Sequence, residues 1–135
     1  MTNIKIHWSF WLISSIALVW NVMGSLNFIM QMDPDTLANY PESAQALIVS
    51  RPSWATIAFA VAVFGGAIGD ILLLLKKAIA YYLFTASLLG VIFANIHTLL
   101  VTSATDILIG SFMSLVVSIS LIIYTRYVKT KGWIN

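Results

Sequence analysis

Four long apolar runs constrain the fold of this chain more than any other feature of its sequence. They cover residues 8–30, 54–75, 79–101 and 107–127. A helix needs about 20 apolar residues to cross the roughly 30 Å hydrocarbon layer of a bilayer, and each run reaches that length. Each run also has aromatic residues near an end, as membrane spans do: Trp8, Trp11, Trp54, Tyr81, Tyr82, Tyr124 and Tyr127. The sequence therefore predicts an all-α, four-helix transmembrane bundle.

Composition agrees with a membrane protein. Of the 135 residues, 60% are hydrophobic and 9% are charged, whereas about 25% of residues are charged in soluble domains. The whole chain is expected to form a single integral membrane domain with the lipid bilayer as its surroundings. It has no cysteine, which excludes disulfides and thiolate metal sites. No basic face suited to nucleic acid is present.

The cations are distributed unevenly between the two ends of the predicted bundle. We expect the first run to be a retained span, because it exceeds the 7–15 residues of a signal-peptide core. Short connections then make neighbouring helices antiparallel, in up-down order. One side receives six of the seven cations, Lys5, Lys76, Lys77, Arg126, Lys129 and Lys131, and the other only Arg51. The positive-inside rule predicts that both termini, including the tail 128–135, are cytoplasmic.

The only long connection, residues 31–53, carries signals for helix starts. Asp33 is placed as an N-cap with Pro34 in the first turn, and Pro41 and Glu42 repeat the signal. The second segment has an apolar face made of Ala44, Leu47 and Ile48. These patterns predict a helical flap on the outer, periplasmic surface.

Each predicted span has one stripe of small or weakly polar residues. In the second span Gly65, Gly66 and Gly69 share a face with Ala62, while bulky aliphatic residues lie opposite. Small residues let helices approach closely, so this is the expected helix-packing face. The other stripes are Ser14, Ala17, Asn21 and Ser25; Ser87, Gly90, Ala94 and Thr98; and Ser111, Ser114, Ser118 and Thr125. Hydroxyls bonding across helices would hold such stripes together, but the same residues would also line a solute path.

Asp70 lies inside the second run, in its cytoplasmic third. A carboxylate within a membrane span suggests a functional site, for a proton or a cation. The alternative is that Asp70 reaches water or the side chain of Lys77, or caps a neighbouring backbone. The sequence favours a role for Asp70 in fixing a helix interface near the cytoplasmic surface.

Three further polar residues lie within the spans. Asn21 is near mid-membrane and requires an interhelical partner, so we expect it to set helix register more than to contact a ligand. Asn21, Asn95 and Asp70 are the candidate contacts for a solute or ion. His97 is a candidate pH-sensitive group, although a hydrogen bond to a loop carbonyl is the expected arrangement. No arrangement typical of an enzyme, a metal site or a cofactor is found, so we expect none of these.

Four stretches of the chain resemble a family of small, poorly characterised bacterial membrane proteins with four spans, often labelled sugar transporters or hypothetical proteins. The stretches are "LVWNVMGSLNFIMQM", "PSWATIAFAVAVFGGAIGDILLLLKK", "SLLGVIFANI" and "KGWI". The resemblance implies the same four-helix topology and a bacterial inner-membrane location. It assigns no binding residues.

Three functions remain open from the sequence. A small-solute permease, acting as a homo-oligomer, would use the inner stripes as a path and predicts a polar cavity. A non-catalytic assembly subunit of a larger membrane complex would use the stripes for packing and predicts a dry bundle. A lipid- or quinone-binding protein needs an apolar groove with few polar groups. We favour transport, mainly because of the family label.

Overall fold

The computed structural model describes residues 5–135, which form six helices and no strand. The helices are α1 (Trp8–Gln31), α2 (Pro34–Leu37), α3 (Glu42–Val49), α4 (Ser53–Leu74), α5 (Ala80–Val101) and α6 (Thr105–Thr130). Helices α1, α4, α5 and α6 are long and apolar enough to cross a membrane. The predicted all-α bundle is therefore confirmed, and the chain is a multi-pass membrane protein.

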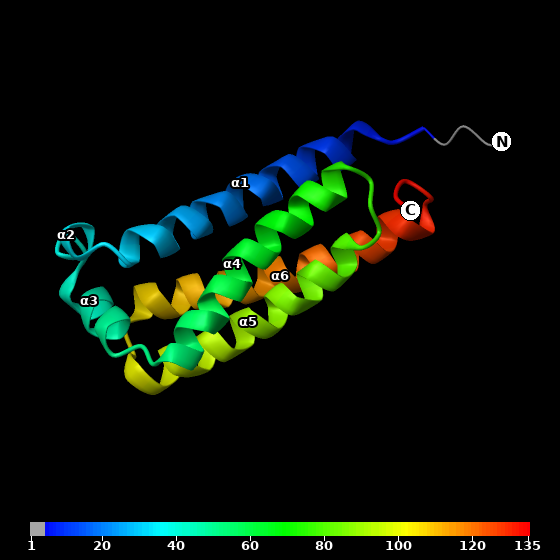
Figure 1. The fold of residues 1–135 in the computed structure, drawn as a ribbon. Coiled ribbons are helices and arrows are strands. Elements are labelled where there is room, and N and C mark those ends of the chain that lie inside the picture. The colour runs from blue at the N-terminus through cyan, green and yellow to red at the C-terminus, as the bar shows by residue number, and fades with distance from the viewer. Residues whose placement is uncertain (1–4) are drawn as a thin grey trace.

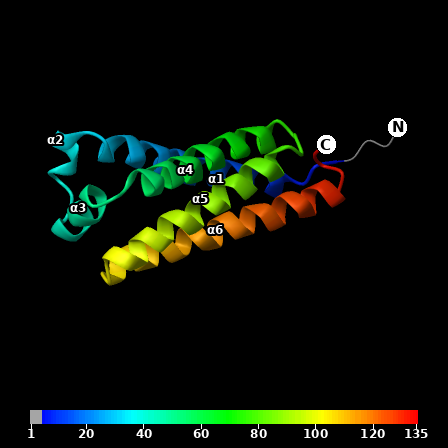
Figure 2. The same ribbon diagram turned by 60° about the horizontal axis from the view of Figure 1, so that its bottom comes forward.

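The short helices and the described chain ends lie at opposite ends of the bundle. Figure 1 shows the four long helices running together, with α2 and α3 at one end and the start of α1 and the C-terminus at the other. We call these the flap end and the terminal end. Helix α1 packs on α4, α4 on α5 and α5 on α6, but no comparable contact joins α1 to α6. Figure 2 shows the same succession from another side. The bundle is therefore less tightly closed between α1 and α6.

Close approach of the helices depends on individual glycines. A Cβ atom added to Gly90 would lie 2.5 Å from the carbonyl oxygen of Ala58, so α4 and α5 touch through their backbones. At Gly69 the same atom would lie 2.8 Å from the Phe84 ring of α5. At Gly66 it would lie 2.6 Å from the Asn21 side chain of α1. The glycine stripe of α4 thus serves two neighbouring helices.

The opposite face of α4 is exposed, as the sequence pattern predicts. Ile57 is 64% exposed and Ile68 is 50% exposed, and both belong to the bulky aliphatic face. Gly65 differs from the other stripe glycines, because an added Cβ would find only ordinary contacts, the nearest at 3.6 Å. Its neighbours would therefore tolerate an alanine.

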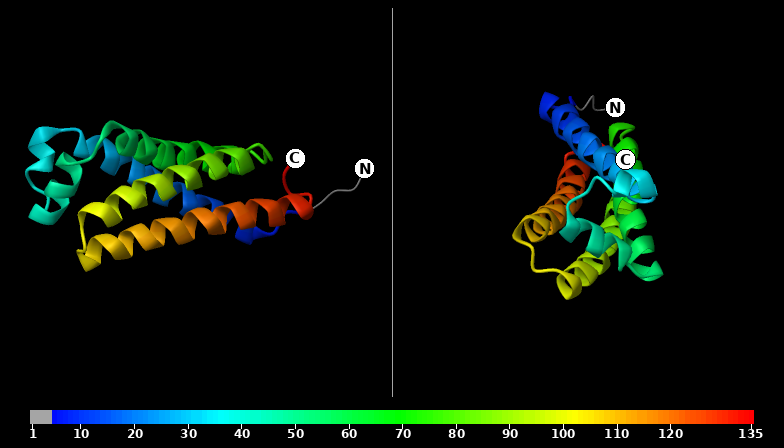
Figure 3. Two further views of the ribbon diagram at one scale, coloured as in Figure 1. Left: turned by 90° about the horizontal axis from the view of Figure 1, so that it is seen from below. Right: turned by 90° about the vertical axis from the view of Figure 1, so that its left-hand side faces the viewer.

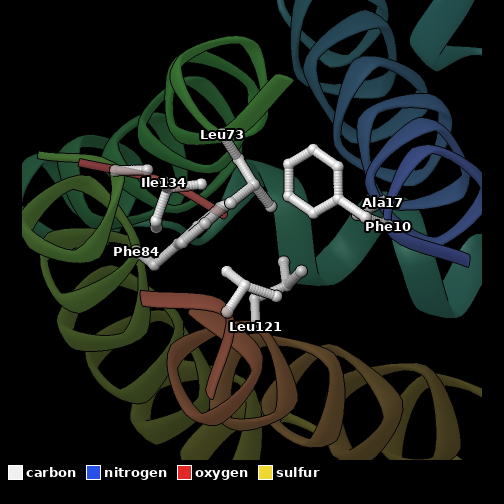
Figure 4. Close-up of a cluster of buried hydrophobic side chains, with 8 residues drawn as sticks. Phe10, Ala17, Leu73, Phe84, Leu121 and Ile134 are labelled. Carbon is white, nitrogen blue, oxygen red and sulfur yellow. The ribbon is translucent and has the colours of Figure 1, made fainter. Parts of the chain in front are cut away.

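The terminal end holds the hydrophobic core. Figure 4 shows that side chains from all four long helices converge there. They include Phe10 of α1, Leu73 of α4, Phe84 of α5 and Leu121 of α6. Phe10 and Leu73 have no exposed surface and Phe84 is 1% exposed. We call this cluster, together with Val128 and Ile134, the terminal-end core.

The last residues of the chain fold back over the terminal-end core. Gly132 has φ 76°, a left-handed conformation that favours glycine, and it ends α6. The N–H of Trp133 then donates to the carbonyl of Val128 at 3.0 Å, the Schellman arrangement of a helix end. Asn135 exchanges backbone hydrogen bonds with the turn between α4 and α5, donating to Lys76 at 3.1 Å and accepting from Ala78 at 2.8 Å. The segment thereby ties α6 to that turn.

The connection after α1 forms the two helices that the sequence predicts. Asp33 caps α2, since its carboxylate accepts from the backbone N–H of Asp35 at 3.4 Å and also from the Thr36 hydroxyl at 2.7 Å. Helix α3 follows, and its Leu47 is buried. The right-hand view of Figure 3 looks onto the flap end and shows α3 lying across the middle of the bundle. The flap, residues 32–52, therefore covers this end.

Candidate functional site

A cavity of about 580 Å³ occupies the flap half of the bundle. Its walls come from all four long helices, and α3 contributes Ala44, Leu47 and Ile48 at the flap end. On α6 the lining runs from Ile107 to Ser118, which corresponds to roughly 16 Å at 1.5 Å per residue. The cavity therefore reaches about half-way along α6 from the flap end.

Polar side chains lie at several levels of this cavity. They comprise four amides, five hydroxyls and one cation: Asn21, Asn27, Gln31, Asn95, Tyr40, Thr98, Ser111, Ser114, Ser118 and Arg51. Apolar side chains such as Phe59 and Val91 complete the walls. A mostly apolar pocket with a few placed polar groups is typical of small-molecule sites. The arrangement suits reversible binding of a polar solute.

Asn21 connects the cavity to a buried carboxylate. Asn21 lines the cavity, and its amide Nδ2 donates to Asp70 Oδ2 at 2.5 Å. Asp70 has no exposed surface, and its other oxygen, Oδ1, has no hydrogen-bond partner among residues 5–135. The alternative that Asp70 reaches water or Lys77 is wrong, and the bond to Asn21 joins α4 to α1, which agrees with the favoured role at a helix interface. The absence of a side chain at Gly66 leaves room for the Asn21 amide beside α4.

The two polar residues late in α5 lie in different surroundings. Asn95 lines the cavity, and its amide donates to the backbone carbonyl of Ser111 on α6 at 3.0 Å. His97 is 5% exposed and packs edge-on against Trp54, with ring centres 6.1 Å apart. Within residues 5–135 no hydrogen bond joins His97 to a loop carbonyl, contrary to expectation, and its contact with an aromatic side chain is the one to Trp54. His97 does not line the cavity.

More hydroxyl groups of the stripes donate hydrogen bonds to carbonyls of their own helix than to carbonyls of a neighbouring helix. Ser87 makes a bond across helices, from its Oγ to the Ala62 carbonyl of α4 at 2.5 Å. Several others donate to the carbonyl four residues earlier in the same helix: Ser25, Thr98, Ser114 and Thr125. The predicted network across helices is therefore largely wrong. A hydroxyl in a helix always has this local acceptor within reach, so it needs no partner on another helix.

Arg51 lines the cavity, although the sequence analysis did not name it as a candidate contact. It lies between α3 and α4, and its Nη1 donates to the Gln31 side chain at 2.9 Å. Its guanidinium carbon lies 4.9 Å from the centre of the Phe59 ring. Burial lowers the pKa of Arg51 from its ordinary value, which is so high that the group stays charged. The signal in the sequence was its isolation as the only cation on its side.

Two hydrogen bonds fix Tyr40 of the flap beside Arg51, one to α1 and one within the flap. The Tyr40 hydroxyl donates to the Asn27 side chain at 2.5 Å, and Gln45 Nε2 donates to the carbonyl of Tyr40 at 2.6 Å. Tyr40 and Asn27 both line the cavity. The position of the flap is therefore linked to two cavity residues.

Metal ligation requires several donors close together. In the part of the chain that the structure describes, no three histidine or acidic side chains gather as a metal site needs.

Comparison with protein-family models gives no match, and neither the curated proteins nor the solved structures contain one. The resemblance to a four-span bacterial family consequently stays a prediction.

Proposed function

We propose that the chain is a small-solute permease of the bacterial inner membrane, with its flap end outside and its terminal end in the cytoplasm. The observation that supports this most is the cavity of about 580 Å³ in the flap half. It extends to mid-membrane, and the terminal-end core lies beyond it. Transporters bind their solutes near the midplane and open to one side at a time. The cavity lies on the flap side of the midplane, under the flap, and the terminal-end core separates it from the opposite end.

The polar lining distinguishes this function from the two alternatives. An assembly subunit would use its stripes for packing and would leave a dry bundle, yet Ser111, Ser114 and Asn95 line a cavity. A quinone or lipid site would need few polar groups, whereas this cavity carries amides at several depths. Both contrasts favour a hydrated path for a solute. Homo-oligomerisation remains a prediction of this proposal.

Swelling of proteoliposomes tests the proposal with a panel of solutes that differ in size and charge. Purified protein is reconstituted, and light scattering follows swelling in iso-osmotic glycerol, sorbitol, glucose and potassium gluconate, the last with valinomycin so that potassium enters with the anion. The matched variants are Ser114→Phe, which fills the cavity, and Ser120→Phe, which places the same side chain on the exposed face of α6. Gel filtration in detergent confirms that both variants fold.

The permease predicts swelling above that of empty liposomes for at least one solute. We expect Ser114→Phe to remove most of this excess and Ser120→Phe to retain it. If no solute enters faster than it enters empty liposomes, the chain is not a permease for this panel. Equal swelling with both variants would show that solute does not pass through the cavity.

A further inference from the structure

The cavity contains one charged side chain, and this charge has no counter-ion within the described residues. Arg51 is bonded to the neutral side chain of Gln31 and lies over the Phe59 ring. No acidic side chain among residues 5–135 pairs with its guanidinium. A guanidinium carries five N–H donors in a fixed plane and suits a carboxylate or phosphate better than any neutral group. Arg51 therefore has capacity to bind an anion.

The surroundings hold Arg51 in place before any ligand arrives. Gln31 is 8% exposed, so the acceptor that positions the guanidinium is itself fixed at the end of α1. Phe59 of α4 supports the other side of the group. Burial disfavours an unpaired charge, which is the reason that the pKa of Arg51 is lowered. An anion bound from the cavity would remove this penalty.

The groups below Arg51 indicate the rest of the ligand. Asn95 and Ser114 lie deeper in the cavity, and Asn21 lies near its inner limit. Amides and hydroxyls both donate and accept hydrogen bonds, so they suit a ligand rich in hydroxyl groups. A lipid held by Arg51 would instead place its acyl chains against these side chains, which would leave their remaining hydrogen-bonding atoms, such as the amide oxygen of Asn95, unpaired.

We propose that the cavity binds a small, water-soluble organic anion, with its acidic group on Arg51 and its hydroxyl groups toward Asn95 and Asn21. This inference rests on the proposed function and names the class of its solute. It assigns to Arg51 the role of an anion-binding residue. The acidic group is a carboxylate or a phosphate.

Equilibrium binding to the detergent-purified full chain tests the inference separately from transport. The probes are radiolabelled gluconate and, as competitors, unlabelled gluconate and sorbitol, which differ by the carboxylate. The variants are Arg51→Gln, Arg51→Lys and Arg126→Gln. Arg126 lies near the opposite end of the bundle beside Tyr81 and gives the same change of net charge. Short-chain phosphatidylglycerol and phosphatidylcholine serve as further competitors.

We expect gluconate to bind, and sorbitol to compete at least tenfold more weakly. Arg51→Gln should weaken gluconate binding at least tenfold, Arg51→Lys should retain part of it, and Arg126→Gln should stay within twofold of the unmodified chain. Equal competition by sorbitol and gluconate would overturn the inference, and this comparison needs no variant. An unchanged affinity in Arg51→Gln would overturn it as well.

Other results separate the two proposals. If gluconate does not bind while proteoliposomes swell in sorbitol, the proposal of a permease is supported and the proposal of an anionic solute is wrong. If gluconate binds through Arg51 but no solute enters the proteoliposomes, the anion site stands and transport is wrong. If phosphatidylglycerol displaces the probe more strongly than unlabelled gluconate does, and phosphatidylcholine does not, the anion belongs to a lipid headgroup, which overturns the soluble ligand.

Discussion

The two halves of the bundle are built from the same stripes of small and hydroxyl-bearing residues but pack differently. In the flap half Gly24, Ala94 and Gly110 lie around a cavity. In the terminal half Phe10, Phe84 and Leu121 fill the equivalent space. Small residues permit close packing only where a neighbour contributes enough volume to fill the interior. The stripes alone therefore do not determine whether a bundle is dry or hollow.

The Asn21 and Asp70 pair lies where the two halves meet. Asn21 faces the cavity, whereas Asp70 is sealed from it, and the two side chains join α1 to α4. The Asn21 side chain thus lies between the cavity and the buried carboxylate of Asp70, and one hydrogen bond joins the two side chains. Substitutions in the flap half, in the terminal half and at this boundary should therefore change the free energy of unfolding by different amounts.

Removing bulk from the terminal half should have the largest effect on stability. Phe84→Ala empties part of the terminal-end core and is expected to lower the free energy of unfolding by about 3–5 kcal/mol. Phe59→Ala removes the same atoms beside an existing cavity and should cost less than about 2 kcal/mol. Denaturant titration in mild detergent, followed by tryptophan fluorescence, measures both. Equal losses would contradict the contrast between the halves.

The hydrogen bond between Asn21 and Asp70 should be broken by one added methyl group at Gly66. In Gly66→Ala the added Cβ displaces the Asn21 side chain, so the buried Asp70 loses its partner, at about 1–3 kcal/mol. Gly65→Ala is the matched control, because its Cβ meets ordinary contacts, and it should be nearly neutral. Thermal unfolding followed by circular dichroism compares the two. A neutral Gly66→Ala would show that the pair contributes nothing to stability.

A smaller effect, of opposite sign, is expected at the turn between α4 and α5. Lys76 has φ 62°, a left-handed conformation that is strained for a residue with a side chain. Lys76→Gly should therefore raise the free energy of unfolding by about 1 kcal/mol. Lys77→Gly serves as the control, since Lys77 is not among the residues with positive φ. A loss of stability in Lys76→Gly would mean that its side chain makes a contact that outweighs the strain.

The helical architecture could be predicted because it depends on local patterns. Apolar length predicted the spans, and the glycine stripe correctly predicted which face of α4 is exposed, since Ile57 and Ile68 lie on the bulky side. The Asp33 cap of α2 is also a local signal. Each of these features depends on residues a few positions apart.

The site was less predictable because it depends on which residues meet across helices. The partner of Asp70 is Asn21, which is 49 positions away in the chain. Asn21 and Asn95 could be identified as candidates from their polarity, but nothing local indicates that Asn21 faces a cavity and Asp70 does not. Arg51 was noted only as the single cation of its side, because a cation next to a predicted loop normally faces water. The packing of α3 and Phe59 places it at the cavity.

Cysteine labelling along α6 tests the contrast between the halves most directly. The chain contains no cysteine, so each introduced thiol is unique. Ser114 lines the cavity, Thr125 is 1% exposed in the terminal half and Ser120 lies on the outer face. Each is replaced by cysteine, and right-side-out and inside-out membrane vesicles are treated with a water-soluble, membrane-impermeant maleimide.

We predict that the thiol of Ser114→Cys reacts in right-side-out vesicles, and that those of Thr125→Cys and Ser120→Cys react in neither preparation. Reaction of Ser114→Cys only in inside-out vesicles would reverse the orientation but retain the cavity. If Ser114→Cys reacts from neither side, or Thr125→Cys reacts as fast as Ser114→Cys, the bundle does not combine a hydrated flap half with a dry terminal half.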